Sequence, residues 1–435
     1  MRDFGPAFRD FGPAFRTGRR VWRPAAGVDA CPTEAIVESE SARRDFCKSA
    51  AAGVLLLKPQ TVFGTQANSA VEVGLIGCGG RGNWLGAFFP EFAGARIVAL
   101  ADVIRERLDA TQASFKVDPA RTYYGPEAYR ELVESKLDAV LIETPPYFHP
   151  EQARAAVDAG KHVYLAKPVA VDVPGCFGIL ESAKRAQGKR SFLVDFQTRA
   201  QPVFQEAAAR IARGDIGKPV FAQVFYYAGR PSPDKSIPGM EAGHARMLNF
   251  YMDRVLGGDI IVEQNIHVID VANWFLAGHP IAAHGAGGRT DWSGTRYNTG
   301  DAYDHFLATF QYPNGVQADF SSNQLTKSFS DLCVRCFGID GAVDAHYGGL
   351  VRITGKNAWL GAEKDDTFRQ GAINNVKAFI DSIQTGMLLN NAELAVESNL
   401  TAILGRNAAY QNRTITWEEL LRSEEKFEAN LKLRW

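Results

Sequence analysis

The sequence has few cysteines, no excess of charge and no long apolar run. Six cysteines among 435 residues are too few for a scaffold built on disulfides. The 48 Lys and Arg residues balance 49 Asp and Glu residues, so the net charge favours neither nucleic acid nor an anionic membrane surface as a partner. No apolar run reaches the roughly 18 residues that a spanning helix needs. The 46% hydrophobic and 22% charged residues are typical of a globular enzyme or binding protein of two or three domains.

Residues 1–70 are expected to be a disordered leader and a signal peptide. A seven-residue segment occurs twice, at 2–8 and 9–15. Two such copies are too few and too short to stack into a repeat architecture. The residues that follow mix Arg, Gly and Pro without periodicity, which predicts no folded element there.

The second part of this leader has the pattern of an export signal. The pair Arg43-Arg44 precedes an apolar stretch at 49–57, and small residues follow up to Ala70. A basic region, a short apolar region and a small-residue cleavage zone occur in the order that export requires, and the paired arginines resemble a twin-arginine signal. The alternative is a basic helix start before a buried helix. We expect export by the twin-arginine machinery to the periplasm or beyond, with cleavage near Ala67 or Ala70.

A nucleotide-binding motif opens the first predicted domain, residues 71–196. An apolar run of strand length ends at Ile76 and a helix-compatible stretch begins at Asn83. The segment between them consists of Gly77, Cys78, Gly79, Gly80, Arg81 and Gly82. In this G-x-G-x-x-G pattern Gly77 permits a tight turn, Gly79 lets main-chain N–H groups approach a pyrophosphate, and Gly82 lets helix and strand pack closely. The helix N-terminus adds partial positive charge for the phosphates.

An acidic residue follows at the expected distance. A second apolar run, 96–101, ends at Asp102, twenty residues after Gly82. The group at this place binds the ribose hydroxyls, and a carboxylate there repels a 2′-phosphate, so it favours NAD over NADP. The alternative is a glycine-rich turn in an unrelated α/β domain.

Strand-like and helix-like segments then alternate. Strands are predicted at 137–142, 162–165 and 191–196, and helices at 150–159 and 174–186. This alternation predicts a parallel sheet with right-handed crossovers. Ligands in such folds bind beyond the carboxyl ends of the strands.

Lys167 stands at one of these strand ends, directly before Pro168. A lysine there could orient a substrate hydroxyl or support proton transfer beside the cofactor. From its position alone, an ordinary surface lysine at a strand end is the alternative.

The residues together resemble the Gfo/Idh/MocA family of oxidoreductases, named for glucose–fructose oxidoreductase and inositol dehydrogenase. In the first half the matching motifs are Gly77-x-Gly79-x-x-Gly82, Asp102, Thr144-Pro145 with His149, residues 160–164 and Lys167-Pro168. In the second half they are Gly257-Gly258-Asp259, Glu263-x-x-x-His267-x-x-Asp270 and Trp274. The resemblance extends from about residue 71 to the C-terminus. It implies cofactor contacts by the glycine segment, Asp102, Thr144, Pro145, His149 and Lys167.

The resemblance implies an α/β Rossmann domain followed by an α+β domain, residues 197–435, with a large open and mostly antiparallel sheet. Strand-like runs at 219–227, 305–311, 316–320 and 332–337 agree with this independently. Amphipathic helices are predicted at 371–385 and 395–410, packed against the dinucleotide domain, and Thr416 is predicted to cap a last short helix.

Two positions depart from the family pattern. The usual Glu-Lys-Pro is Ala166-Lys167-Pro168 in this chain, so a carboxylate that could touch the cofactor ribose or tune the lysine is missing. The usual Asp four residues before the histidine is Glu263, which keeps the charge and lengthens the side chain.

The second-half motif predicts acid–base chemistry. If residues 261–276 form one helix, Glu263, His267 and Asp270 share a face. A carboxylate beside an imidazole orients it and raises its basicity. We expect His267 to be the base, Glu263 to bind a substrate hydroxyl, Lys167 to hold the reacting oxygen, and Asp270 to support them. An ordinary amphipathic helix with a core histidine is the alternative. A zinc site would need further ligands, and we predict no metal.

Further polar residues are candidates for a sugar site. The substrate-binding residues predicted are Lys167, Arg199, Tyr227, Asn249, Tyr251, Asn265 and Asp270. Others of the same kind are Gln197, Arg230, Asp253 and Arg254. Cys333 and Cys336 fall three apart in a strand-like run, so they face opposite sides of the sheet and are not expected to form a metal or redox pair.

The expected function is NAD(P)-dependent hydride transfer on a sugar, polyol or glycoside hydroxyl. One alternative uses the same residues in an NAD-dependent glycoside hydrolase that works by transient oxidation and elimination. Another is a dinucleotide-binding protein without catalysis, because of Ala166. Free nicotinamide cofactor is scarce outside the cytoplasm, so an exported enzyme should hold its NAD tightly. The resemblance also implies a homo-oligomer, a dimer or tetramer.

Overall fold

The computed structural model describes residues 70–325, 329–364 and 366–432. The short tandem copy and the predicted twin-arginine signal fall on residues 1–69, outside this part of the chain, so both stay predictions. None of the helices in the described ranges is long and apolar enough to cross a membrane.

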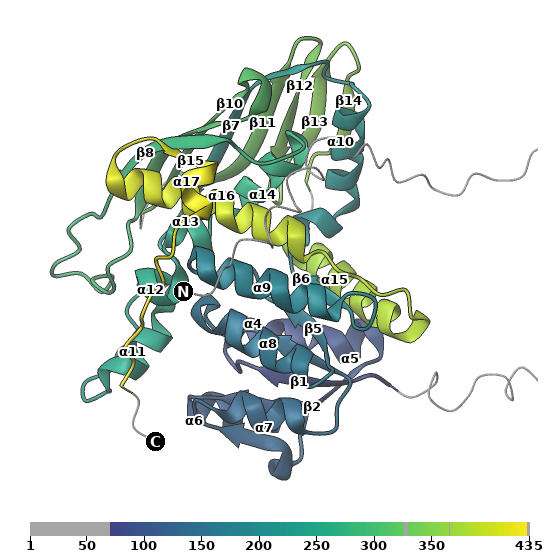
Figure 1. The fold of residues 1–435 in the computed structure, drawn as a ribbon, viewed down its shortest axis with the longest axis vertical. Helices are drawn as coiled ribbons and strands as arrows, with labels where there is room; N and C mark the ends of the chain where they lie inside the picture. The colour runs from purple at the N-terminus through teal and green to yellow at the C-terminus, as the bar shows by residue number, and fades with distance from the viewer. Residues whose placement is uncertain (1–69, 326–328, 365, 433–435) are drawn as a thin grey trace, which may run out of the picture. The chain divides into compact units, whose positions relative to one another are not determined.

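The first sheet has six parallel strands in the order β3-β2-β1-β4-β5-β6 (Figure 1). The strands are β1 (Glu72–Ile76), β2 (Arg96–Asp102), β3 (Thr122–Tyr124), β4 (Ala139–Ile142), β5 (His162–Leu165) and β6 (Phe192–Val194). The helices between them are α4 (Gly80–Gly86), α5 (Phe88–Ala93), α6 (Arg105–Phe115), α7 (Ala128–Glu134), α8 (His149–Asp158) and α9 (Val173–Ala186). The predicted Rossmann sheet is confirmed. The order of strands reverses between β1 and β4, which opens a crevice at their carboxyl ends.

The strands of this sheet are buried on both faces. All four residues of β4 are buried, as are three of the four in β5. Strands covered by helices on both sides read as continuous apolar runs, which is why the sequence predicted them well. The three-residue β3 was not predicted, because its residues are only partly buried and form no apolar run, unlike the equally short but buried β6.

The second sheet has nine strands in the order β14-β13-β12-β11-β7-β10-β9-β8-β15. They are β7 (Pro219–Ala228), β8 (Ala282–Gly288), β9 (His305–Gln311), β10 (Gln317–Gln324), β11 (Asp331–Gly338), β12 (Gly341–His346), β13 (Val351–Gly355), β14 (Trp359–Ala362) and β15 (Ile415–Thr416). Among the described strands of this sheet, only β7 and β10 pair in parallel. The predicted large, mostly antiparallel sheet is confirmed.

The described helices of the second half are α10 (Pro202–Ala212), α11 (Ala242–Leu248), α12 (Arg254–Gly257), α13 (Ile260–Glu263), α14 (Ile266–Phe275), α15 (Thr367–Thr385), α16 (Ala392–Gln411) and α17 (Trp417–Leu421). Of these helices, α10, α14 and α16 pack against the second sheet, whereas α15 packs against the first half. In Figure 1, α16 runs between α9 and the sheet, and it contacts both α9 and β8.

The two long C-terminal helices pack differently from each other. Phe379 of α15 meets Tyr164 of β5, with ring centroids 5.4 Å apart, so α15 packs against the dinucleotide domain as predicted. By contrast, α16 lies between that domain and the second sheet. Thr416 caps α17 as predicted, since its hydroxyl accepts a hydrogen bond of 3.1 Å from the Glu419 N–H.

The predicted single helix over 261–276 is wrong. The N–H of Asn265 donates to the carbonyl of Ile260, five residues back, at 2.9 Å. This wider turn ends α13 at Glu263, and α14 begins afresh at Ile266. Glu263 and His267 therefore do not share one helical face, although both remain at the same junction.

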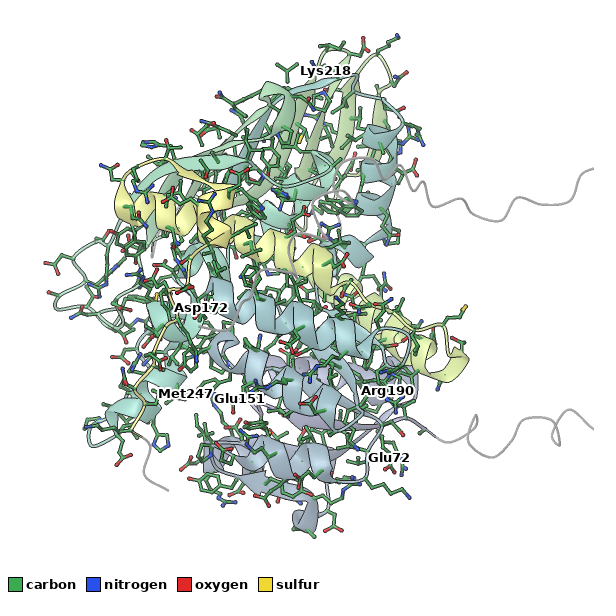
Figure 2. All side chains as sticks on the ribbon, in the orientation of Figure 1. Glu72, Glu151, Asp172, Arg190, Lys218 and Met247 are labelled. Atoms are coloured by element: carbon green, nitrogen blue, oxygen red, sulfur yellow. The ribbon has the colours of Figure 1, made fainter. Side chains whose placement is uncertain are left out.

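The last described segment returns to the first half. Asp172, labelled in Figure 2, caps α9 by accepting from the Gly175 N–H at 2.8 Å, and its other oxygen accepts from the Phe427 N–H at 2.8 Å. Met247 of α11, also labelled, packs in a small apolar cluster with Ala429. These contacts fix α11 beside the C-terminal segment, and α11 supplies part of the wall of the site.

Candidate cofactor and substrate site

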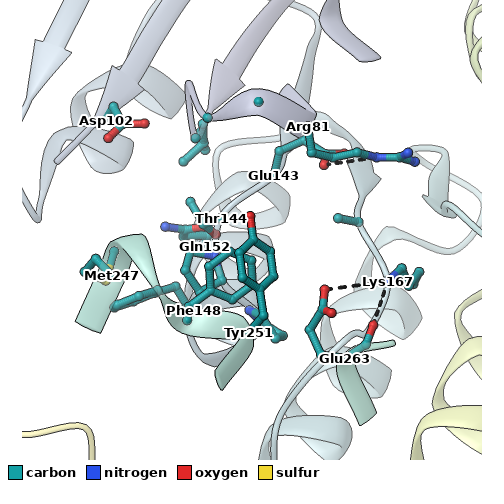
Figure 3. A pocket seen from close by; sticks show the side chains of 18 of the residues that line it. Arg81, Asp102, Glu143, Thr144, Phe148, Gln152, Lys167, Met247, Tyr251 and Glu263 are labelled. Atoms are coloured by element: carbon teal, nitrogen blue, oxygen red, sulfur yellow. Dashed lines mark hydrogen bonds and ion pairs between the residues drawn. The ribbon is translucent and has the colours of Figure 1, made fainter. Parts of the chain in front are cut away.

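A cavity of about 560 Å³ lies at the carboxyl ends of the parallel strands (Figure 3). Its wall comes from the first half and, in the second half, from α11, α13, α14 and α15 and from the strands β7 and β11. The predicted residues that line it are Gly77, Gly79, Gly80, Arg81, Asp102, Thr144, Pro145, Lys167, Tyr251, Glu263 and His267. Gln197 also lines it.

The glycine segment has a shape that only glycine allows. A Cβ on Gly82 would lie 2.0 Å from the Gly77 carbonyl oxygen, and one on Gly77 would lie 2.7 Å from the main chain of Glu143. Gly77 also has a φ of 98°, which side-chain-bearing residues rarely adopt. A Cβ on Gly80 would meet nothing within 4 Å, so there is free space above the first turn of α4. This space beside exposed main-chain N–H groups fits the pyrophosphate of a dinucleotide.

Asp102 fastens the glycine segment to the end of β2. One carboxylate oxygen accepts from the Cys78 N–H at 2.6 Å, and the other accepts from the Ile104 N–H at 2.7 Å. Burial raises the pKa of Asp102, and these hydrogen bonds oppose that rise. Arg107, which the sequence analysis missed, lines the cavity nearby. Arginine in this region can accommodate a 2′-phosphate, so the acid and the arginine favour different cofactors.

His149 does not line the cavity but joins the two turns that do. Its Nδ1 lies 2.8 Å from the Pro168 carbonyl oxygen, and its Nε2 lies 2.8 Å from the Thr144 carbonyl oxygen. The ring is fully buried. Thr144 itself donates to Gln152 at 2.6 Å. We therefore assign His149 to holding the turns in place and not to direct cofactor contact.

Replacing His149 by glutamine is expected to destabilise the protein by about 1–3 kcal/mol at pH 7.5, because the buried ring loses its packing and the one hydrogen bond that the neutral imidazole donates to a carbonyl. Burial lowers the pKa of His149 to about 4 from its ordinary 6.5. Between these values the unfolded chain binds a proton that the folded chain does not, so wild-type stability falls as pH drops below 6.5. The variant lacks this loss. Urea unfolding should show that the difference in free energy of unfolding between wild type and variant is smaller at pH 5.0 than at pH 7.5. A difference that does not depend on pH would contradict this prediction.

Lys167 and Glu263 are brought together from the two halves of the chain (Figure 3). The Lys167 Nζ donates to the Glu263 carbonyl oxygen at 2.6 Å and lies 3.7 Å from its carboxylate Oε1. The other oxygen, Oε2, is buried without a hydrogen-bond partner among the described residues. Burial lowers the pKa of Lys167, and the charge of Glu263 opposes that shift. The pairing of these two side chains is not visible in the sequence, where 96 positions separate them.

His267 is a neutral imidazole at the same cavity. Burial lowers its pKa well below the ordinary 6.5, and the charges of Lys167 and Arg81 lower it further. Its Nδ1 has no hydrogen-bond partner within the described ranges. The predicted pairing of Glu263 with His267 is absent from the hydrogen bonds of these ranges, because the helix break turns Glu263 toward Lys167. The ring of Tyr347, another cavity residue, lies 5.4 Å away.

The sequence analysis missed two buried carboxyl groups that line the cavity. Glu143 follows β4 and Asp195 follows β6. Arg81 lies between them, with its Nη2 2.5 Å from Asp195 and its Nε 3.8 Å from Glu143. Asp195 also accepts from the Asn375 side chain at 2.8 Å. Polar residues directly after three buried strands were the available signal, but only Lys167 was singled out.

Arg199 and Asp270 bind each other and are not among the cavity-lining residues. The Arg199 Nε lies 2.9–3.0 Å from both carboxylate oxygens of Asp270, and Ser398 donates to the same carboxylate at 2.7 Å. The predicted substrate role of this pair is replaced by a structural one, since the groups satisfy each other.

Tyr227, Asn249 and Asn265 also lie outside the wall of the cavity. Tyr227 points to the opposite face of the sheet and bonds Ser321 at 2.5 Å. Its neighbour Tyr226 faces the cavity instead and donates to Gln264 at 3.0 Å. Asn249 holds a loop through Asp234 and neighbouring residues, whereas both amide atoms of the buried Asn265 lack partners among the described residues.

The two cysteines of β11 face opposite sides of the sheet, as predicted, because Val334 and Cys336 belong to the main core and Cys333 does not. Asp331, Cys333 and His346 place ligand-type atoms within 4.8 Å of one another. However, His346 already contacts Asp331 at 2.7 Å and Asp344 at 3.0 Å. Arg335 binds Asp344 at 2.7 Å. These contacts account for the cluster as an ion-pair network, and the expectation of no metal stays a prediction.

The fold and cavity define a dinucleotide-binding Rossmann protein with an open-sheet C-terminal domain. The family model described as an oxidoreductase family with an NAD-binding Rossmann fold matches residues 71–195, and that of the GFO/IDH/MocA C-terminal domain matches residues 204–344. The chain belongs to the Gfo/Idh/MocA family of oxidoreductases.

Relatives and solved structures agree with this assignment. The scyllo-inositol 2-dehydrogenase (NAD(+)) of Bacillus subtilis is 24% identical over 255 residues, 58% of this chain and 66% of the relative. An inositol 2-dehydrogenase of Salmonella typhimurium is 26% identical over 208 residues, 47% of this chain and 54% of the relative. The matches thus span between about half and two thirds of these curated relatives.

Two solved structures illustrate the likeness of fold. The myo-inositol 2-dehydrogenase of Lactobacillus plantarum superposes with a TM-score of 0.64 at 19% identity, covering 80% of this chain and 99% of the other. The aldose–aldose oxidoreductase of Caulobacter crescentus, complexed with glycerol, superposes with a TM-score of 0.65 at 18% identity, covering 80% and 100%. At these identities the likeness establishes the two-domain fold.

Proposed function

We propose that this protein is an NAD(P)-dependent oxidoreductase that transfers a hydride between a hydroxyl-bearing carbon of a sugar, polyol or glycoside and a nicotinamide. The observation that carries the proposal is the meeting of Lys167, Glu263 and His267 at the cavity that the glycine segment also lines. A nicotinamide cofactor supplies the hydride acceptor in such chemistry. The names of the inositol dehydrogenase relatives support the substrate class.

The three side chains have complementary tasks. His267 is held neutral by burial, so its imidazole accepts the proton of the reacting hydroxyl. The Lys167 ammonium donates a hydrogen bond to the oxygen of that hydroxyl, which stabilises negative charge as it develops. The unpartnered Oε2 of Glu263 accepts a hydrogen bond from a neighbouring hydroxyl and orients the substrate.

NAD is the proposed cofactor in preference to NADP. The Asp102 carboxylate at the end of β2 supports this choice, because it lines the cavity and repels a 2′-phosphate. Arg107 is the residue that would favour NADP. In this proposal the glycine segment binds the pyrophosphate through the N–H groups of Gly79 and Gly80.

The test is to mix the protein and NAD with a panel of inositols, aldoses and aryl glycosides. Absorbance at 340 nm and aglycone release are followed together. We expect absorbance to rise with at least one polyol or sugar and no aglycone release. Release without net absorbance change would instead support the glycoside hydrolase alternative. Bound NAD that no compound alters would support a protein without catalysis.

We also propose export and self-association. The proposal of export rests on the paired arginines and the apolar stretch of the leader, and replacing Arg43 and Arg44 by lysine should retain the protein in the cytoplasm.

The proposal of a homo-oligomer rests on the family resemblance and on apolar side chains of one sheet face, Leu307 and Leu360, which are 61% and 58% exposed. Light scattering should give a mass of two or four chains.

A further inference from the structure

Three strand ends stand side by side at the floor of the cavity. Ile142 of β4 pairs with Leu165 of β5, and Leu165 pairs with Val194 of β6. The residues that follow these strands are Glu143, Ala166 and Asp195, and all three line the cavity. The middle position carries only a methyl group, so two carboxyl groups flank the strand end from which Lys167 continues.

Of these two carboxyl groups, that of Asp195 has a hydrogen-bond partner on each oxygen. It accepts from Arg81 at 2.5 Å and from Asn375 at 2.8 Å. Glu143 is equally buried, with a side chain that is 1% exposed, but its Oε2 lies 3.8 Å from Arg81 and its Oε1 has no hydrogen-bond partner in the described ranges. A buried carboxyl oxygen without a partner costs free energy, and its retention at a cavity wall therefore calls for a role there.

We propose that Glu143 is the positioning residue for Lys167 and takes the place of the carboxylate that position 166 lacks. It acts from the end of β4 on a lysine that leaves the neighbouring end of β5. The expected effect on kcat rests on the proposed function. The expected effect on the titration of Lys167 does not.

The electrostatics of the group agree with this geometry. Burial raises the pKa of Glu143 to about 8, while the charge of Arg81 lowers it, Asp195 raises it and Lys167 lowers it. Burial lowers the pKa of Lys167, and the charge of Glu263, which forms an ion pair with the lysine, opposes this shift most. Arg81 lowers the pKa of Lys167 further, whereas Asp195 and then Glu143 raise it. Above about pH 8, where Glu143 carries its negative charge, it therefore helps to keep the Lys167 ammonium charged against the desolvation that burial imposes.

The test compares Glu143→Gln with wild type. Glutamine keeps the size and removes the charge. At about pH 9, where Glu143 is ionised, we expect kcat to fall tenfold or more and the KM for NAD to stay within twofold, and we expect the alkaline limb of the kcat–pH profile to move to lower pH. Lysine-selective ¹³C NMR, with the Lys167 signal assigned by Lys167→Arg, should show its titration midpoint falling by at least half a pH unit. The NMR titration needs no substrate.

Two further variants make the result specific. Ala166→Glu in the Glu143→Gln background should restore the Lys167 titration and part of kcat, because the added carboxylate enters from the middle strand end. Glu397→Gln is the matched control: burial raises the pKa of Glu397 to about 7, but Glu397 is not among the cavity-lining residues. It should leave both readouts unchanged.

The inference is overturned if Glu143→Gln leaves the Lys167 titration unchanged, including when thermal stability or NAD binding falls, since Glu143 would then only anchor Arg81. It is also overturned if Glu397→Gln shifts the lysine equally. A shifted titration in a protein that oxidises no compound of the panel would refute the proposed function and leave the positioning role standing.

Discussion

The Lys167→Ala variant is expected to lose about 10²- to 10⁴-fold in kcat, the range that a well-placed proton-transfer or polar catalytic group contributes. The reason is that the Lys167 Nζ lies where both halves of the chain meet, 2.6 Å from the Glu263 carbonyl oxygen, and in the proposed mechanism it donates a hydrogen bond to the reacting oxygen. NAD affinity should change by less than about threefold, because the glycine segment and Asp102 are the residues proposed to bind the dinucleotide. Stopped-flow absorbance at 340 nm and fluorescence titration with NADH measure the two quantities.

The control for this variant is Lys184→Ala, which removes an exposed lysine in the last turn of α9 and should leave kcat unaltered. His267→Ala should resemble Lys167→Ala, with kcat lost and the cofactor retained. Full activity in either catalytic variant would remove that residue from the proposed mechanism. Loss of NADH binding together with activity would reassign Lys167 to cofactor binding.

The Asp102→Asn variant is expected to weaken NAD binding at least tenfold and to reduce the preference for NAD over NADP. Both Asp102 oxygens accept main-chain hydrogen bonds, from Cys78 and from Ile104. An asparagine offers one oxygen and one NH₂ group, so one of the two N–H groups would face another donor. The glycine segment would lose its fastening, and the charge that repels a 2′-phosphate would be gone. About 1.4 kcal/mol corresponds to this tenfold change.

Fluorescence titration with NADH and NADPH measures this effect. Asp109→Asn is the control, because Asp109 is an exposed acid on α6 whose side chain is 65% exposed. If Asp102→Asn binds both cofactors as wild type does, Asp102 does not select the cofactor. If the variant gains NADPH affinity, Arg107→Ala in the same background should remove the gain.

The parts of the site that could be predicted were those in which a short segment of sequence carries the whole signal. The glycine segment, Asp102 and Lys167 each follow a buried strand, and such strand ends meet at one edge of a parallel sheet. The prediction of one helix over 261–276 was wrong because helical periodicity is compatible with both arrangements, and only the hydrogen bond from Asn265 to Ile260 decides for a break.

The choice between Tyr226 and Tyr227 shows a second limit. Successive strand residues face opposite sides of a sheet, and both tyrosines suit a sugar site equally well. Which side faces the cavity depends on where α14 packs against β7 and β11. Arg199 and Asp270 likewise had the right chemistry for a substrate, but they lie close enough to satisfy each other.

The amino-acid sequence by itself determined the Rossmann half and the class of cofactor, because these depend on periodicity and on glycines within one short segment. The open sheet of the second half was implied by the family resemblance, and the strand-like runs of the sequence agreed with it. The tertiary structure alone decided which carboxyl groups accompany Lys167. Glu263 comes from the other half of the chain, and Glu143 comes from the neighbouring strand end. Such pairings depend on how separate segments pack in space, and spacing along the chain carries no information about that.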